Sequence, residues 1–265
     1  MRSASAVSAL RMPLRMPMPA PLAVPTPLAR APPTMRLQYA SDLHLEAANP
    51  PPFAALLTPI APYLALCGDV GSLAQPQPLR AFLEHCAARF QRVFYVPGIH
   101  DRSSAVPALC AHLPNVHVLE RGAVYLPEHN VAVLGAPRLS SSDQAWLDGA
   151  LEAWRGRGAA VVVLTHTPPT PALIPLRDRR VDSVHADCSH LLRPPVRAWL
   201  CGHSNGGAVT LTAGGVLCSL NARGYPPVPG YCTRLFVDVT GPGAEEAARL
   251  EAEALDPLLC AAALE

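Results

Sequence analysis

The chain of 265 residues contains no lysine, so arginine carries all 21 of its positive charges, against 20 negative charges from Asp and Glu. Charged residues make up only 15% of the chain, and the net charge is +1. This balance argues against strongly electrostatic binding of nucleic acid, although it leaves room for a local basic patch. No run of about 18 apolar residues is free of proline and charge, so the sequence predicts no transmembrane helix. The eight cysteines form no CxxC pair, and we interpret them as reduced thiols of an intracellular protein.

Proline is abundant by contrast, with 31 residues, and eight of them lie in the first 34 residues with four arginines and no acidic residue. An acid-free, basic N-terminus is typical of an organelle transit peptide, but proline disfavours the amphipathic helix of such peptides. The alternatives are an unstructured tail or a start of translation at Met35. We expect residues 1–34 to be unstructured and residues 35–265 to form one folded domain. We expect a cytoplasmic location unless residues 1–34 direct the chain to an organelle.

Short apolar runs alternate with helix-compatible stretches beyond Met35. Runs such as AVVVL at residues 160–164 are apolar throughout, which is typical of strands buried on both faces of a sheet. Helices are predicted where apolar residues recur along one face, over residues 79–90, 142–154 and 244–255, with Ser142 as an N-cap. We predict strands over residues 36–40, 63–67, 92–96, 116–119, 131–134, 160–164, 196–201, 208–212, 216–220 and 231–239. This order predicts a layered α/β fold in which helices cover the sheets.

Five of the predicted strands end in the same way, with an apolar run followed by a polar turn that contains Asp or His. Each turn alone is ordinary, but sites in open α/β sheets form beyond the carboxyl ends of the strands, so the five together indicate one shared site. Carboxylate and imidazole ligands suit Mn, Fe, Zn or Ni better than Ca or Mg. Two such ions can clamp a phosphate and acidify a water molecule. The residues are Asp42 and His44 in YASDLHLE, Asp69 in LALCGDV, His100 and Asp101 in FYVPGIHD, His166 in VVVLTHTPP, and His203 and Asn205 in WLCGHSN.

These five blocks, in this order, resemble the calcineurin-like metallophosphoesterase superfamily. The pattern of that superfamily is Asp-x-His, Gly-Asp, Gly-Asn-His-Asp/Glu, His, and Gly-His-x-His. The resemblance covers roughly residues 35–240 and implies a four-layer α/β/β/α sandwich with a dimetal site at one edge. The segments QYASDLHLE and LNARGYP also look like a small intracellular subgroup of this superfamily.

The resemblance implies a role for each matched residue. Asp69 matches the carboxylate that bridges two metals. Asp42 and His44 match further ligands of the first metal, and His166 and His203 match further ligands of the second.

His100 matches the catalytic histidine that contacts the phosphate or the leaving group, and Asp101 matches the carboxylate that orients its ring. Arg223, which follows a predicted strand in NARGY, is a candidate for bidentate contact with a substrate phosphate. The alternative is a surface arginine in a turn.

Two positions depart from the superfamily pattern. Ile99 stands where the pattern has the ligand Asn. Asn205 stands where it has the last His, and its amide oxygen is still a candidate ligand of the first metal. We therefore expect one or two divalent ions per chain, chosen from Mn, Fe, Zn or Ni. The function expected is a metallophosphoesterase that hydrolyses a phosphomonoester or phosphodiester with a metal-activated water. The alternative is a non-catalytic member of the same fold that acts as a binding or scaffold protein. The partner expected is a phosphorylated substrate rather than nucleic acid or a membrane.

Overall fold

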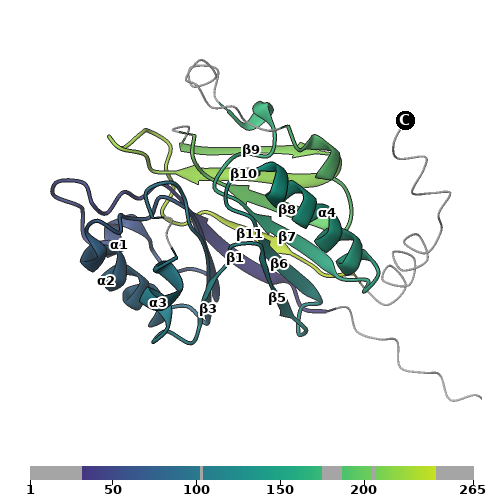
Figure 1. Cartoon of the computed structure of the whole chain (residues 1–265), viewed down its shortest axis with the longest axis horizontal. Helices are drawn as coiled ribbons and strands as arrows, with labels where there is room; N and C mark the ends of the chain where they lie inside the picture. Colours follow the sequence, from purple (N-terminus) through teal and green to yellow (C-terminus); the bar gives the residue numbers. More distant parts are fainter. Residues whose placement is uncertain (1–31, 102–103, 175–186, 205–206, 243–265) are drawn as a thin grey trace, which may run out of the picture.

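The computed structural model describes residues 32–101, 104–174, 187–204 and 207–242. Their helices and strands form two sheets with helices on the outside (Figure 1). The α-helices are α1 (Phe53–Leu56), α2 (Pro76–Ala87), α3 (Val106–Cys110) and α4 (Ser141–Arg155), and two short 3₁₀ helices are η1 (Pro171–Leu173) and η2 (Ser189–Leu191). The strands are β1 (Met35–Ala40), β2 (Tyr63–Cys67), β3 (Arg92–Val96), β4 (Val116–Val118), β5 (Gly122–Leu126), β6 (Val131–Gly135), β7 (Ala160–Leu164), β8 (Val196–Cys201), β9 (Gly207–Ala213), β10 (Val216–Ala222) and β11 (Phe236–Val239).

Both sheets are built around parallel strands. The first sheet has the order β11-β1-β2-β3-β4, and the second has the order β5-β6-β7-β8-β10-β9. Only the edge strands β11, β5 and β9 pair antiparallel with their neighbours. All other pairs are parallel, so their carboxyl ends meet at one edge of each sheet.

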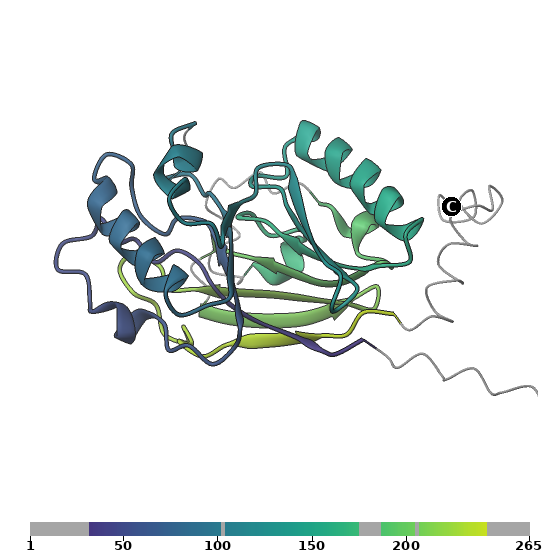
Figure 2. The same cartoon turned by 90° about the horizontal axis from the view of Figure 1, so that it is seen from below.

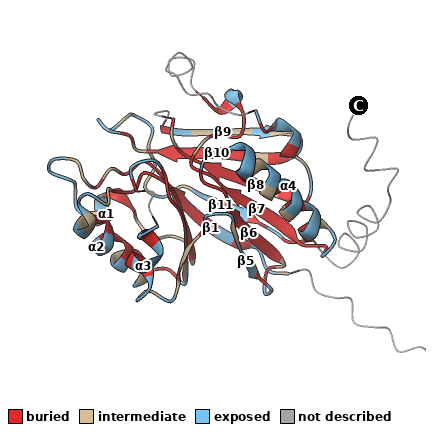
Figure 3. Cartoon of the chain, viewed as in Figure 1, coloured by how far each residue is buried: buried red, intermediate tan, exposed pale blue. Residues whose placement is uncertain are grey.

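The strand β7 explains why the sheets stack. All five of its residues are buried, and successive side chains point to opposite faces of a strand. Val161 and Val163 belong to the core under α4, whereas Val162 and Leu164 belong to the core between the two sheets. A third core lies between the first sheet and α1, α2 and α3. Three cores separate four layers, which gives the expected α/β/β/α sandwich (Figures 2 and 3).

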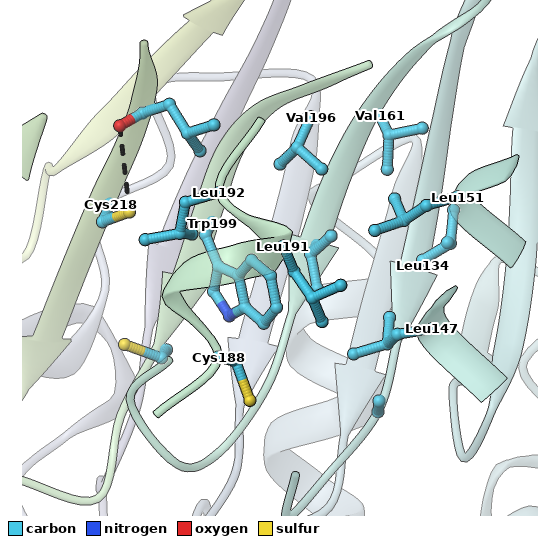
Figure 4. Packing of buried hydrophobic residues seen from close by; sticks show 14 of the residues in the cluster. Leu134, Leu147, Leu151, Val161, Cys188, Leu191, Leu192, Val196, Trp199 and Cys218 are labelled. Atoms are coloured by element: carbon cyan, nitrogen blue, oxygen red, sulfur yellow. Dashed lines mark hydrogen bonds between the residues drawn. The ribbon is translucent and has the colours of Figure 1, made fainter. Parts of the chain in front are cut away.

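The helix α4 covers the second sheet through Leu147 and Leu151, which face Trp199 of β8 and the segment around η2 (Figure 4). The helix begins with a capping box, in which Ser140 accepts from the backbone N–H of Asp143 and the Asp143 side chain accepts from the Ser140 N–H. Ser140, rather than the predicted Ser142, is therefore the N-cap. The capping box satisfies two N–H groups that the first turn otherwise leaves unpaired.

Most predicted elements appear within one to three residues of their expected ends. The predicted strand at 231–239 is confined to β11, and β5 and the short helices α1 and α3 were not predicted. The predicted helix at 244–255 lies outside the described residues. Within the described part of the chain, no helix is long and apolar enough to cross a membrane. The seven cysteines described there are all free thiols.

Candidate metal centre

The five predicted turns converge where the carboxyl ends of the parallel strands meet. Asp42, Asp69 and His100 follow β1, β2 and β3 of the first sheet, and His166 and His203 follow β7 and β8 of the second. Backbone hydrogen bonds connect the turns to one another. The N–H of His44 donates to the carbonyl of Asp69, and the N–H of Gly202 donates to the carbonyl of His166. The expected gathering of these residues at one sheet edge is observed.

Four residues of this region hold an unusual backbone conformation. Asp42, His44, Asp69 and His203 have φ angles of 55°, 49°, 51° and 68°. Non-glycine residues seldom adopt positive φ, and each costs free energy that the surrounding structure must offset. These four residues are half of the eight described non-glycine residues with positive φ, and the sequence analysis singled out all four as metal ligands. These turns direct four side chains into one small volume.

Two clusters of potential metal ligands share one carboxylate. Asp42, His44 and Asp69 each place a ligand atom within 4.8 Å of the others, and so do Asp69, His166 and His203. Asp69 is thus common to both clusters, as a bridging carboxylate requires. Its Oδ1 accepts hydrogen bonds from the backbone N–H groups of Ile99 (2.6 Å) and His100 (2.9 Å). These bonds fix the orientation of the carboxylate and leave Oδ2 facing His166 at 3.3 Å.

His166 supplies the test of whether a metal fits. Its ring is fully buried, and Nδ1 lies 3.0 Å from the carbonyl oxygen of Cys67. A carbonyl can only accept, so Nδ1 carries the proton and, in the neutral ring, Nε2 carries a lone pair. Nε2 is buried and makes no hydrogen bond, and the nearest polar atom given for it is Oδ2 of Asp69 at 3.3 Å. An N-donor that is oriented by a carbonyl and lies beside a carboxylate fits a transition-metal ion.

The charges around this ring also call for a cation. Burial raises the pKa of Asp42 to about 6, despite the opposing effect of His166. Burial alone would lower the pKa of His166, but Asp69 and Asp42 outweigh it and raise the value to about 9. The pKa of Asp69 is lowered, because His166 and the backbone N–H of His100 outweigh the opposite effect of burial. Protons on buried groups thus balance the two carboxylates, a role that a bound cation would take over.

Close packing at two glycines keeps the centre compact. Gly68 has a φ of +84°, and a Cβ atom there would overlap the His166 ring. A Cβ atom at Gly98 would overlap the carboxylate of Asp69. Only glycine lets the backbone approach these ligands so closely.

Asp101 has partners other than the predicted one. Its fully buried carboxylate accepts from the N–H groups of Gly98 (2.5 Å), Val70 (2.8 Å) and Asp69 (3.3 Å), and from the hydroxyl of Tyr95 (2.6 Å). Burial, aided by the charge of Asp69, raises the pKa of Asp101 against the effect of Tyr95. Among the described residues, Asp101 therefore ties the turn after β2 to the turn after β3, instead of orienting the His100 ring. Its effect on the centre acts through the position of Asp69.

The His100 ring faces Glu46, a residue that the sequence analysis missed. The His100 side chain is 54% exposed, and its Nδ1 lies 3.9 Å from Glu46 Oε1. The same Oε1 lies 2.9 Å from Nδ1 of His44. Glu46, His44 and His100 form a third group whose potential ligand atoms lie within 4.8 Å of one another. The segment DLHLE could have indicated this contact, because Glu46 follows His44 by two positions.

A cavity of about 550 Å³ opens onto the two clusters. Of the candidate ligands, Asp42, His44, Asp69 and His203 line it, whereas His166 is buried behind them. Its other lining residues include Glu46, His100, Ile99 and Tyr225. Ile99, at the position where the superfamily pattern has Asn, places its side chain in this cavity and contributes no ligand atom. Asn205 lies outside the described residues.

Arg223 uses part of its guanidinium within the protein. One of its terminal nitrogens, NH1, donates to the carbonyl of Leu43 at 3.0 Å, and its backbone N–H donates to the carbonyl of Ser41. These bonds support the turn that carries Asp42 and His44. Arg223 does not line the cavity among the described residues, so a contact with substrate remains a prediction.

A solved structure similar to this chain shows its class of fold. A dimetal phosphatase from Danio rerio matches with a TM-score of 0.53, over 78% of this chain and 92% of its own length, at 14% identity. Phosphopantetheinyl hydrolase from Mycobacterium tuberculosis matches with a TM-score of 0.49, over 74% of this chain and 91% of its own, at 19% identity. No protein-family model and no curated protein matches the sequence. The chain has a metallophosphoesterase-type fold, which confirms the predicted α/β/β/α sandwich.

Proposed function

We propose that this protein is a metal-dependent phosphoesterase that hydrolyses a phosphomonoester or a phosphodiester. The observation that carries the proposal is the carboxylate of Asp69, which is shared by two clusters of potential ligands. The buried Nε2 of His166, which makes no hydrogen bond and faces Asp69 in the second cluster, supports it. The metallophosphoesterase-type fold supports it as well.

The residues divide between holding cations and handling the substrate. Asp42, His44 and Asp69 would hold one ion of Mn, Fe, Zn or Ni, and Asp69, His166 and His203 would hold the other. Bound divalent cations neutralise charge on a phosphoryl group and acidify water near neutral pH.

His100 would handle the proton of the leaving group. It lies on the cavity and is half exposed, so its ring is accessible to a substrate. In its protonated form it would donate to the leaving oxygen as the ester bond breaks. Glu46 Oε1 lies 3.9 Å from Nδ1 of this ring.

Ile99 favours a second candidate, a binding protein that has kept the fold and lost catalysis. Its hydrocarbon side chain supplies no ligand to the second cluster, and a metal bound by three residues is held less tightly than one bound by four. The two candidates make different predictions about metal content and hydrolysis.

The test combines both measurements on protein purified without chelator and incubated with Mn. We expect elemental mass spectrometry to find one or two ions per chain, and the protein to hydrolyse bis(p-nitrophenyl) phosphate or p-nitrophenyl phosphate only with metal. Asp69→Asn should abolish hydrolysis, whereas Asp148→Asn, at an exposed position of α4, should not. Metal-dependent hydrolysis would support the phosphoesterase. Retained metal without hydrolysis, or absence of metal, would overturn it in favour of the non-catalytic binding protein.

A further inference from the structure

Two exposed apolar side chains lie at the candidate metal centre. The described residues include four large hydrophobic side chains that are exposed, and two of them, Ile99 (52%) and Tyr225 (58%), line the same cavity. The other two have partners elsewhere. Tyr125 packs against the Trp154 ring and bonds to Asn130, and Phe236 lies under the guanidinium of Arg36.

The backbone holds both residues of this pair next to candidate ligands. The N–H of Ile99 donates to Oδ1 of Asp69 at 2.6 Å. The residue before Tyr225, Gly224, donates its N–H to the carbonyl of Asp42 at 2.9 Å. The Tyr225 ring also lies 6.4 Å from the His44 ring, centroid to centroid. Two loops from different sheets therefore present an apolar surface at a fixed distance from the two clusters.

The charged residues that line the cavity bear on how many phosphate groups the substrate carries. The lining includes the carboxylates of Asp42, Glu46 and Asp69, and no arginine among the described residues. Arg223, the arginine nearest to Tyr225 in the sequence, donates to the carbonyl of Leu43. Recognition of a second or third phosphate group usually depends on Arg or Lys. Asp42 and Asp69 would hold the cations, so the charged group that the described lining would offer to a further phosphate is the carboxylate of Glu46.

We propose that Ile99 and Tyr225 bind the organic arm of the substrate, and that the substrates are esters with a single phosphoryl group and an aromatic or aliphatic arm. This inference rests on the proposed phosphoesterase function. With the phosphoryl group at the clusters, the arm lies against Ile99 and the face of Tyr225. Burial of apolar surface and ring stacking both favour this placement. The presence of isoleucine in place of the superfamily's asparagine then sets the selectivity of the site.

The probes for the test are phenylphosphonate and methylphosphonate, which cannot be hydrolysed as esters and which differ in their apolar arm. Isothermal titration calorimetry of the Mn-loaded protein should show phenylphosphonate binding roughly tenfold more tightly, as expected for about 1.4 kcal/mol. This ratio should fall towards one in the double variant Ile99→Ser/Tyr225→Ala. The control Tyr125→Ala removes an exposed aromatic residue far from the cavity and should keep the ratio. Circular dichroism of each variant confirms that it is folded.

The outcomes separate this inference from the function on which it rests. Equal affinity for the two phosphonates in the unmodified protein, or an unchanged ratio in the double variant, would overturn the role of Ile99 and Tyr225 while leaving the phosphoesterase intact. If neither phosphonate bound the Mn-loaded protein, and no ester were hydrolysed, both proposals would fail. A ratio that falls in the Tyr125→Ala control would assign the effect to general destabilisation and also contradict the inference.

Discussion

The carboxylate of Glu46 bonds to Nδ1 of His44 at 2.9 Å. Because the carboxylate accepts the Nδ1 proton, the other ring nitrogen of a neutral His44 is available as a ligand. Carboxylate–histidine pairs of this kind fix the orientation of a metal-binding ring and increase its basicity. The orientation of the His44 ring is thus fixed by Glu46, which lies two positions further along the chain.

Replacement of Glu46 should weaken metal binding. We expect Glu46→Ala to lower the affinity for Mn roughly 10- to 100-fold, as substitution of a residue that hydrogen-bonds to a metal ligand commonly does. Glu46→Gln should retain most of the affinity, because the amide oxygen still accepts from Nδ1. The matched control is Glu84→Ala, which removes a carboxylate bonded to the exposed His112 at 3.0 Å. Calorimetric titration measures the Mn affinity of all three variants. An equal loss of affinity in Glu46→Gln and Glu46→Ala would argue against the role of Glu46 as the hydrogen-bond acceptor of His44.

Restoring asparagine at position 99 should strengthen the second cluster. Ile99→Asn places an amide oxygen at the position where the pattern that this sequence resembles has a ligand, and we expect Mn affinity and any hydrolytic activity to rise, the affinity by roughly tenfold. Ile99→Ala removes the same apolar side chain without adding an oxygen, so it serves as the control. An affinity that does not change in Ile99→Asn would mean that residue 99 does not face the bound ion. Titration of chelator-treated protein with Mn distinguishes the two results.

Asp101 should contribute to the stability of the fold, although it does not line the cavity. Asp101→Ala leaves the buried N–H groups of Gly98 and Val70 without their acceptor, and we expect a loss of about 3 kcal/mol in the free energy of unfolding. Tyr95→Phe removes one of the donors to the same carboxylate and should cost about 1 kcal/mol. Urea denaturation measures both. Asp148→Ala on the exposed face of α4 should change stability little, and a similar effect at all three positions would contradict the assignment.

The metal-free protein should become less stable as the pH rises. Folding raises the pKa of His166 from 6.5 to about 9, so the folded state binds a proton more tightly than the unfolded state. The stability from this group is complete below pH 6.5 and is lost as the pH rises through about 9. In thermal unfolding with chelator, Tm should therefore fall over this range.

Addition of Mn should oppose this loss, since the cation replaces the proton and binds better as the ligands deprotonate. The difference in Tm between Mn-loaded and chelator-treated protein should thus widen with pH. His166→Asn should remove most of the pH dependence of the metal-free protein, whereas the exposed substitution His112→Asn should preserve it. A Tm that is independent of pH without metal would contradict the proton's role at His166.

Local pattern was sufficient to predict the strands that position the centre. β2 and β7 are continuous apolar runs bounded by turns, and both occur with their predicted ends. β5 was missed because its residues alternate in exposure and begin with glycine and alanine, and its antiparallel pairing with β6 supplies what its own sequence lacks. The N-cap of α4 was misplaced by two residues, although the local sequence contained the signal for it. Only Ser140 stands three residues before Asp143, as the capping box requires.

The sequence by itself determined the layered α/β architecture, the edge at which the site forms and the residue types gathered there. Hydrophobic periodicity and strand-end turns are properties of short segments, so they can be recognised without coordinates. Tertiary structure alone decided that Asp101 braces two turns, that Glu46 faces both His44 and His100, and that Ile99 and Tyr225 share one cavity. These relationships depend on turns with positive φ and on contacts between distant segments, such as the bond from the His203 N–H to Asp42 across 161 residues. No local pattern encodes such contacts, because their geometry exists only once both sheets have packed.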